Sequence, residues 1–172
     1  MQLKEELEGY QEGSTFWDPR RIARIAIFIA LSAVGALVKV PSPTGTVALD
    51  ACSAFFTAIT FGAKEGSIVA FLGHILTAAI TGFPLGVPTH LYIALQMAVW
   101  VSIFWYVATK INLILAVVIA ILCNGILSAL LIIPIGGFGL AAALMLPLTV
   151  GAAINVIIAS FAYLIVSKSN MV

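Results

Sequence analysis

Long apolar stretches constrain this chain more than any other feature. Six of them, each bounded by charged residues or by proline and glycine, are predicted to be helices: residues 21–38, 47–62, 67–82, 89–108, 113–133 and 143–166. A helix needs about 20 apolar residues to cross the hydrocarbon core of a bilayer. Since 62% of the residues are hydrophobic and only 9% are charged, a soluble domain of this size would leave much apolar area in water. The sequence therefore predicts an all-α integral membrane protein with six transmembrane helices.

The domain organisation is expected to be simple. No long linker divides the apolar segments, so residues 19–172 are predicted to form a single six-helix membrane domain. Residues 1–18 are polar and acidic and lack the basic start of a signal peptide, so they are expected to form a cytoplasmic tail or a surface helix. The second and third segments are short for a span, and neighbouring helices or water must cover their backbone ends.

Lysine and arginine predict the orientation, because cations that flank short spans are retained on the cytoplasmic side. If six helices alternate in direction, one side of the membrane receives Arg20, Arg21, Arg24, Lys64, Lys110 and Lys168. Lys39 lies on the opposite side. Both termini are then cytoplasmic, and the external loops are residues 39–50, 82–88 and 134–139.

Strongly polar side chains within the predicted helices lie in the outer part of the membrane or near its middle, and none lies in the inner half, as counted from the rise of about 1.5 Å per residue. Polar residues in a membrane normally face a bundle interior or a wet cavity, so this gradient predicts a pocket that is open outward and closed inward. The candidate binding residues in the helices, or at the outer end of one, are Asp50, His74, Thr77, His90, Tyr92, Gln96, Asn124 and Asn155. The first external loop adds Ser42, Thr44, Gly45 and Thr46.

Several of these residues have a structural alternative. Asn124 and Asn155 can form hydrogen bonds between helices, His74 can bond to a neighbouring hydroxyl, and Asp50 can cap the second helix. The two histidines, separated by a loop rich in proline and glycine, lack the spacing of a metal site, and neither a metal nor a cofactor is expected.

Other features exclude classes of function. Cys52 and Cys123 lie in apolar segments and are expected to act as small apolar side chains. A net charge of +1 gives no indication of a nucleic-acid partner. The chain contains no HExxH, GxSxG or GxxxxGK[ST] motif, so we do not expect an enzyme, and any ATPase must be a separate protein. A self-sufficient secondary transporter remains an alternative, although no acidic relay crosses the apolar segments.

Small residues follow one face of the first segment. Ala26 and Ala30 form an AxxxA pattern, and Ala33 continues the strip. Small residues four apart allow a second helix to approach closely in lipid. That second helix can belong to the same bundle or to a partner protein.

The chain after Trp17 combines the AxxxA pattern with six spans joined by short loops, a long first external loop and the run FGAKEGSIVAFLGHILTAAITGFPLGVPTH. In these features it resembles the substrate-binding S components of energy-coupling factor (ECF) transporters. The resemblance implies that the first loop lids the pocket and that Ala26, Ala30 and Ala33 contact the coupling transmembrane subunit. It also implies two separate ATPase subunits and a location in the cytoplasmic membrane of a prokaryote.

The stretches PSPTGTVALD, EGSIVAFLGH and GFPLGVPTH are most similar to the α-ribazole branch of this family. The expected substrate is therefore α-ribazole or another cobalamin-related precursor. A different vitamin, such as thiamine, riboflavin or a queuosine precursor, is the alternative. A nucleoside-like ligand would suit apolar walls drawn from Phe55, Phe83, Tyr92 or Trp100.

Overall fold

The computed structural model describes residues 18–42 and 45–169. Most of these residues are helical, and the helices are α2 (Pro19–Gly35), α3 (Cys52–Phe61), α4 (Ala63–Ile80), α5 (Val87–Lys110), α6 (Leu113–Ile121), α7 (Ser128–Leu130) and α8 (Ile133–Lys168). A π-helical segment, η1 (Leu122–Leu127), joins α6 to α7. Between α2 and α3, the strands β1 (Lys39–Ser42) and β2 (Gly45–Ala48) pair antiparallel, with Lys39 opposite Ala48.

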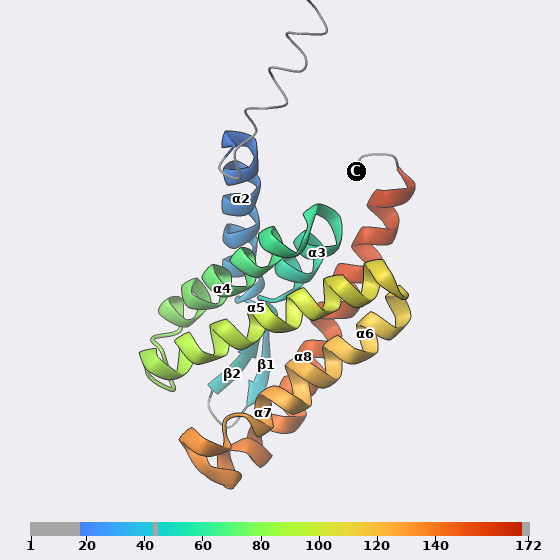
Figure 1. Ribbon diagram of the computed structural model, residues 1–172. Coiled ribbons are helices and arrows are strands. Elements are labelled where there is room, and N and C mark those ends of the chain that lie inside the picture. The colour runs from blue at the N-terminus through green and yellow to red at the C-terminus, as the bar shows by residue number, and fades with distance from the viewer. Residues whose placement is uncertain (1–17, 43–44, 170–172) are drawn as a thin grey trace, which may run out of the picture.

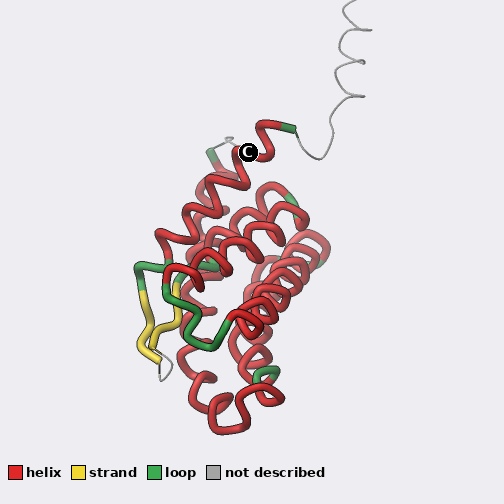
Figure 2. Tube along the Cα trace, turned by 90° about the vertical axis from the view of Figure 1, so that its left-hand side faces the viewer, coloured by secondary structure: helices red, strands yellow, loops and turns green. Residues whose placement is uncertain are grey.

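The helices form one bundle with two distinct ends. Helix α4 packs against α2, α3 and α5, and α8 packs against α3, α6 and η1. Figure 1 shows the start of α2 and the end of α8 at one end of the molecule, with the hairpin displaced towards the other end. The hairpin contacts α8, and in Figure 2 it lies on the outside of the helical bundle. The bundle therefore has a terminal end and a hairpin end.

Small residues allow the helices to approach closely in the core. A Cβ atom on Gly66 would lie 2.7 Å from Ala58 Cα, and one on Gly125 would lie 2.7 Å from Thr149 Cα. Larger side chains pack elsewhere in the core: the rings of Phe55 and Phe104 meet edge to face with centroids 5.1 Å apart. Glycine at these helix crossings thus sets the distance between α3 and α4 and between η1 and α8.

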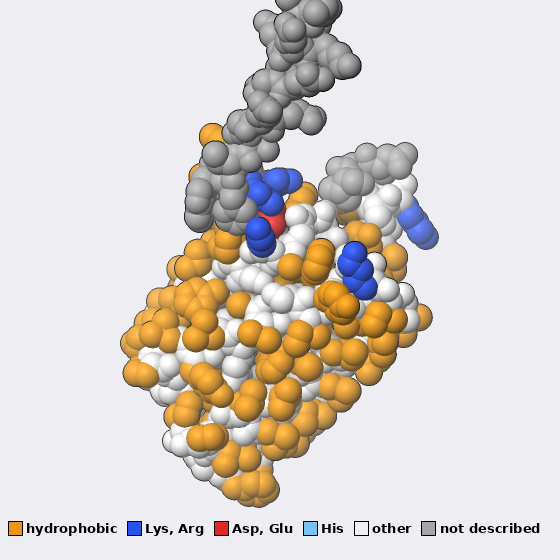
Figure 3. All heavy atoms as spheres, in the orientation of Figure 1, with side chains coloured by type: hydrophobic (Ala, Val, Ile, Leu, Met, Phe, Trp, Pro, Cys, Tyr) orange, Lys and Arg blue, Asp and Glu red, His pale blue; other side chains and the backbone are white. Residues whose placement is uncertain are grey.

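The outer surface is apolar, as a lipid-facing surface requires. Large hydrophobic side chains point outward from several helices, including Leu95 at 59% exposure and Leu146 at 73%. Figure 3 shows hydrophobic side chains over most of one face, with the visible Lys and Arg side chains gathered toward the terminal end. Four described segments are long and apolar enough to cross a membrane: Ala63–Ile80, Val87–Lys110, Leu113–Leu130 and Ile133–Lys168.

Charged residues fasten α2 to α4 at the terminal end. The Arg21 guanidinium lies 2.5 Å from the carboxylate of Glu65, whose side chain is only 4% exposed. Nearby, the Arg24 guanidinium lies 4.6 Å from the centre of the Phe61 ring. Because Glu65 is nearly excluded from solvent, its charge needs the Arg21 partner.

The structure corrects three parts of the predicted secondary structure. The second helix begins at Cys52 rather than at Val47, which lies in β2. The all-α prediction missed the hairpin, where β-branched residues such as Val40 and Val47 favour an extended backbone. Residues 134–139, predicted to be a loop, belong to α8 and are interrupted at Gly137, whose φ of 74° breaks the helix.

Other parts of the predicted topology stay predictions. Helix α2 has 17 residues and α3 has 10, so both are shorter than a full span at about 1.5 Å per residue. Six transmembrane helices, cytoplasmic termini and a lid formed by the first external loop are not decided by these lengths. Of the proposed tail, only Asp18 belongs to the described residues.

Candidate functional site

A cavity of about 520 Å3 lies inside the bundle, towards the hairpin end. Its walls come from the end of β2 and the start of α3, from α4, α5 and the turn between them, and from the η1 to α8 region. The lining residues are Ala48, Asp50, Ala51, His74, Thr77, Ala78, Ile80, Thr81, Pro84, Leu85, His90, Ile93, Gln96, Met97, Asn124, Ser128, Ile132, Leu144, Leu148, Gly151, Ala152 and Asn155. Seven of the predicted binding residues are among them: Asp50, His74, Thr77, His90, Gln96, Asn124 and Asn155.

Helical periodicity explains how these residues meet. His74 and Thr77 on α4, and Thr81 at its C-cap, follow one face at spacings of three and four residues. On α5, the lining face passes through His90, Ile93 and Met97. The two helices therefore present both polar and apolar groups to the same space.

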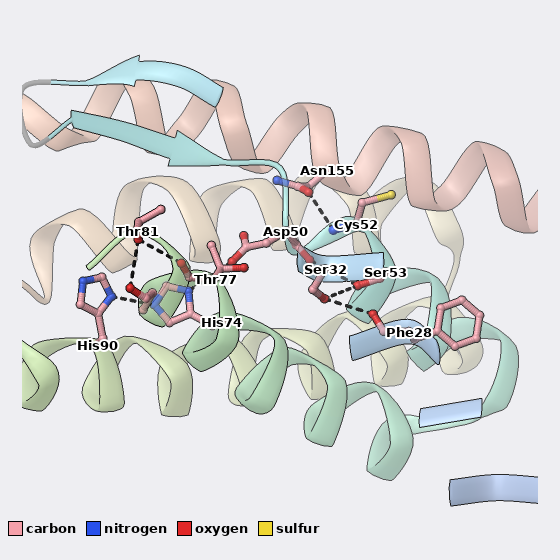
Figure 4. A network of polar contacts seen from close by, with 11 residues as sticks. Phe28, Ser32, Asp50, Cys52, Ser53, His74, Thr77, Thr81, His90 and Asn155 are labelled. Atoms are coloured by element: carbon pink, nitrogen blue, oxygen red, sulfur yellow. Dashed lines mark hydrogen bonds and ion pairs between the residues drawn. The ribbon is translucent and has the colours of Figure 1, made fainter. Parts of the chain in front are cut away.

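Three ionisable side chains form a row at one wall. His74 Nε2 lies 3.2 Å from His90 Nδ1, and His74 Nδ1 lies 3.4 Å from Asp50 Oδ2. The second pair is close but is not aligned as a hydrogen bond. Figure 4 shows His74 between the other two side chains, with Asp50 reaching it from the segment that leads into α3. The sequence placed both histidines at the pocket but did not predict that their rings touch.

Within the described residues, several buried polar atoms in the cavity wall have no hydrogen-bond partner. They are Asp50 Oδ2, His74 Nδ1, Thr77 Oγ1, His90 Nε2 and both side-chain polar atoms of Gln96. Thr77 is 4% exposed, and His90 and Gln96 are each 7% exposed. A buried polar group without a hydrogen bond costs about 1 to 3 kcal/mol. Such a concentration of unpaired groups around one space is the pattern expected where a small polar molecule completes the hydrogen bonds.

Other polar groups in the wall are already engaged in holding the fold. Asn155 Oδ1 accepts a hydrogen bond from the Cys52 backbone N–H at 2.7 Å, and Asn155 Nδ2 donates to the Gly151 carbonyl at 2.9 Å. This is the interhelical role that the sequence left open for Asn155. The Trp100 indole N–H donates to Ser128 Oγ at 2.8 Å, which places a tryptophan directly behind a lining residue.

The carboxylate of Asp50 is not used as a helix cap. Ala51 occupies the N-cap position of α3, and the first backbone N–H of the helix, on Cys52, donates to Asn155 Oδ1 rather than to Asp50. Asp50 is 7% exposed and lines the cavity. The alternative in which Asp50 only starts the second helix is therefore wrong.

Asn124 lies in η1, where the helix widens to π geometry. A π-helical turn inserts one extra residue and re-aims the side chains after it. Asn124 and Ser128 both line the cavity, as their spacing of four residues indicates. The sequence carried no signal for the π geometry itself.

Some predicted residues lie elsewhere. Tyr92 does not line the cavity, because the lining face of α5 passes through Ile93, which is rotated about 100° from Tyr92 on a helix. Ser42 does not line it either. Gly45 and Thr46 have a described backbone in β2, but the Thr46 side chain is outside the described part, as is Thr44 entirely.

The expected aromatic walls are absent from the described lining residues. Phe55 packs against Phe104 in the core, and Trp100 is separated from the cavity by Ser128. Phe83 meets His90 edge to face with centroids 5.7 Å apart but does not line the space. Aliphatic side chains form the apolar walls instead: Ile93, Met97, Ile132, Leu144 and Leu148.

Of the α8 residues that line the cavity, the sequence analysis predicted only Asn155. Leu144, Leu148 and Gly151 precede it at helical spacing and share its face. Tracing that spacing backwards from Asn155 would have found them. Among the described residues, no group of three or more His, Cys, Asp or Glu side chains is arranged to hold a metal ion.

The small-residue strip lies on the outside of the bundle. Ala26 and Ala30 are exposed on α2, and Ala33 is half-buried. The adjacent face of the helix carries Ile25 and Ser32, which are buried against the rest of the molecule. The strip is therefore open to a partner, or to lipid, at Ala26 and Ala30.

Comparisons with known proteins agree with this arrangement. The profile of the family described as "ECF transporter, substrate-specific component" matches residues 20–167. The fold is similar to that of the S component of a bacterial ECF transporter, with a TM-score of 0.64 and 18% sequence identity over 88% of this chain and 95% of that one. A search of curated proteins gave no match. The family prediction is thereby confirmed, while the α-ribazole branch stays a prediction. The chain belongs to the substrate-specific components of ECF transporters.

Proposed function

We propose that this chain binds α-ribazole, or another cobalamin-related precursor, in the cavity between α4, α5 and α8. The observation that carries the proposal is the combination of about 520 Å3 of space with several buried polar atoms that find no hydrogen-bond partner in the described part of the chain. A nucleoside offers hydroxyls that both donate and accept hydrogen bonds, together with a flat apolar base. The hydroxyls match the polar wall, and the base matches the aliphatic one.

The charges of the wall favour a ligand without negative charge. The described lining residues include the Asp50 carboxylate and two imidazoles, and they include neither lysine nor arginine. An anion placed beside Asp50 would meet like charge at low dielectric. A neutral nucleoside avoids this repulsion.

The hairpin is proposed to act as the lid of the site. Ala48, at the end of β2, already lines the cavity, and Asp50 follows it by two residues. Movement of the hairpin would therefore move one wall of the site together with its carboxylate. Sealing the cavity in this way would exclude water and strengthen each polar contact.

Transport is proposed to require a coupling transmembrane subunit and two ATPase subunits. S components work with such a module, and the exposed Ala26 and Ala30 offer α2 as the contact surface. The assembly is placed in the cytoplasmic membrane of a prokaryote. In proteoliposomes, uptake is expected only with the module and ATP. Uptake by the purified chain alone, driven by a proton or sodium gradient, would instead identify a secondary transporter.

Titration of the purified protein with α-ribazole, 5,6-dimethylbenzimidazole, thiamine and riboflavin tests the substrate. Trp100 is a built-in reporter, because its indole is hydrogen-bonded to the lining residue Ser128. We expect α-ribazole to change the fluorescence at low concentration and the free base to bind much more weakly. The Trp100→Phe variant is the control and should lose the signal while calorimetry still detects binding. Tight binding of thiamine or riboflavin without binding of α-ribazole would reject the proposed substrate.

A further inference from the structure

In the row formed by Asp50, His74 and His90, each side chain influences where the next one carries its proton. Asp50 Oδ2 faces His74 Nδ1 at 3.4 Å, and the other nitrogen of the same ring faces His90 Nδ1 at 3.2 Å. His90 Nε2, at the far end of the row, is buried and has no hydrogen-bond partner among residues 18–42 and 45–169. The protonation of each nitrogen is therefore constrained by its neighbour.

The first constraint comes from the carboxylate. A neutral imidazole carries one proton, on either Nδ1 or Nε2. With a carboxylate oxygen 3.4 Å from His74 Nδ1, a proton on Nδ1 is attracted to the negative charge, whereas a lone pair there would be repelled. The proton of His74 is thus held on Nδ1, and its Nε2 is left as a lone pair.

The second constraint follows from the contact between the rings. Two lone pairs cannot share a hydrogen bond, so the contact of 3.2 Å between His74 Nε2 and His90 Nδ1 requires that His90 Nδ1 be the donor. The single proton of His90 is then on Nδ1. Its Nε2 becomes a hydrogen-bond acceptor that is buried in a residue only 7% exposed.

We propose that Asp50 acts through His74 to hold His90 Nε2 as an acceptor, so that the site selects a ligand carrying an O–H or N–H donor at this point. The inference rests on the proposed function, in that the cavity is the binding site. Asp50 and His74 are positioning residues for this contact. The selected ligand class comprises hydroxylated or amine-bearing molecules, and an analogue in which that donor is replaced by an ether would bind about tenfold less tightly.

The opposite polarity requires one more proton in the row. If His74 were cationic, it would donate from both nitrogens, His90 Nδ1 would accept, and His90 Nε2 would be an N–H donor. The heavy atoms would not have to move. The two assignments therefore predict opposite hydrogen-bonding roles for the same buried atom, which an experiment can distinguish.

Nitrogen-15 NMR of the histidine side chains is the deciding experiment. The chain contains two histidines, so protein purified without a histidine tag gives four ring-nitrogen signals, and His74→Gln and His90→Gln assign them. Protonated and unprotonated imidazole nitrogens have well-separated shifts. In ligand-free protein near neutral pH, we expect His74 Nδ1 and His90 Nδ1 to be protonated and His90 Nε2 to be unprotonated.

Substitution of the carboxylate tests the relay. In Asp50→Ala, both rings should become mixtures of tautomers, and the second variant, Asp50→Asn, keeps the size of the side chain if Asp50→Ala is too unstable to measure. The matched control is Asp18→Ala, at the start of α2, which should leave all four signals unchanged. A protonated His90 Nε2 in the unsubstituted protein, or His90 signals that do not respond to substitution of Asp50, would overturn the proposal.

Addition of α-ribazole separates this inference from the proposed function. If the ligand binds, the His90 Nε2 signal should shift while remaining that of an unprotonated nitrogen, as expected for an acceptor. Binding that leaves His90 Nε2 unchanged would refute the donor requirement while preserving the function. Failure of α-ribazole to bind would reject that substrate, and the tautomer measurement on the free protein would still decide the polarity of the row.

Discussion

His74 Nε2 and His90 Nδ1 lie 3.2 Å apart, although the two residues belong to different helices. The contact joins α4 to α5 inside the cavity, with the ring centroids 5.3 Å apart. Asp50 approaches the same pair from the end of the hairpin. This cluster of three side chains thus connects α4 and α5 with the hairpin that is proposed to act as a lid.

The first prediction concerns Asp50. Asp50→Ala should weaken the binding of α-ribazole by about 10-fold to 100-fold, because hydrogen bonds that involve a charged group contribute about 1.5 to 3 kcal/mol. Asp50→Asn keeps the size and one acceptor, so it should lose less. Isothermal titration calorimetry measures both. The matched control is Asp18→Ala, and unchanged affinity in Asp50→Ala with a folded protein would show that the carboxylate does not contribute to the site.

The second prediction concerns stability and affinity together. Thr77→Val and Gln96→Leu remove buried polar atoms that are not hydrogen-bonded to any described residue, so the ligand-free variants should have a higher Tm than the unsubstituted protein. The same variants should bind α-ribazole less tightly. Thermal unfolding with and without ligand measures both effects in one series.

Thr57→Val is the control for this pair. Thr57 is buried, but its hydroxyl already donates to the Ser53 carbonyl at 2.7 Å, and it does not line the cavity. Its substitution should leave ligand affinity unchanged and should not raise the Tm. If Thr77→Val and Gln96→Leu instead lower the Tm of the free protein, these groups are paired in the folded state, and the argument from unpaired atoms fails.

The third prediction concerns α2. Ala26→Trp and Ala30→Trp should prevent assembly with the coupling subunit while leaving α-ribazole affinity within about twofold, because both residues are exposed and neither lines the cavity. Co-purification with the module measures assembly. Val118→Trp, on the exposed face of α6, is the control and should assemble normally. Loss of ligand binding with assembly intact would mean that this strip supports the bundle itself.

The fourth prediction concerns the ion pair at the terminal end. Glu65→Ala removes the partner of Arg21 and should cost about 1.5 to 3 kcal/mol of stability. For a chain of this size, about 1 kcal/mol shifts the Tm by about 2 to 4 °C. Lys110→Ala, at an exposed position at the end of α5, should shift it much less. Equal shifts in the two variants would mean that the Arg21–Glu65 contact does not stabilise the fold.

Features that depend on one segment at a time were predictable from the sequence. Apolar length gave the helices, and the depth of polar residues placed Asp50, His74 and Gln96 together, as the cavity shows. These inferences use only the helical rise and the cost of polar groups in lipid. They do not require knowledge of how any two helices are rotated relative to each other.

Features that depend on relative rotation were not predictable. The contact between His74 and His90 is set by the turn that joins α4 to α5, where Phe83 adopts a φ of 49° and Gly82 and Gly86 each adopt 80°. Tyr92 was assigned to the cavity because helical spacing puts it on the same face as Gln96, whereas the neighbouring residue Ile93 lines the cavity. One polar residue cannot define the lining face of a helix when the wall of the site is itself mostly aliphatic.

The most direct test is mass spectrometry of the small molecules released from gently purified protein. The unsubstituted protein, expressed in cells supplied with α-ribazole, should release α-ribazole in near-stoichiometric amount. Gln96→Leu, purified in parallel, should release much less, and Thr57→Val should release as much as the unsubstituted protein. Release of no compound, or of equal amounts from the Gln96→Leu variant, would contradict the account that the cavity between α4, α5 and α8 is the substrate site.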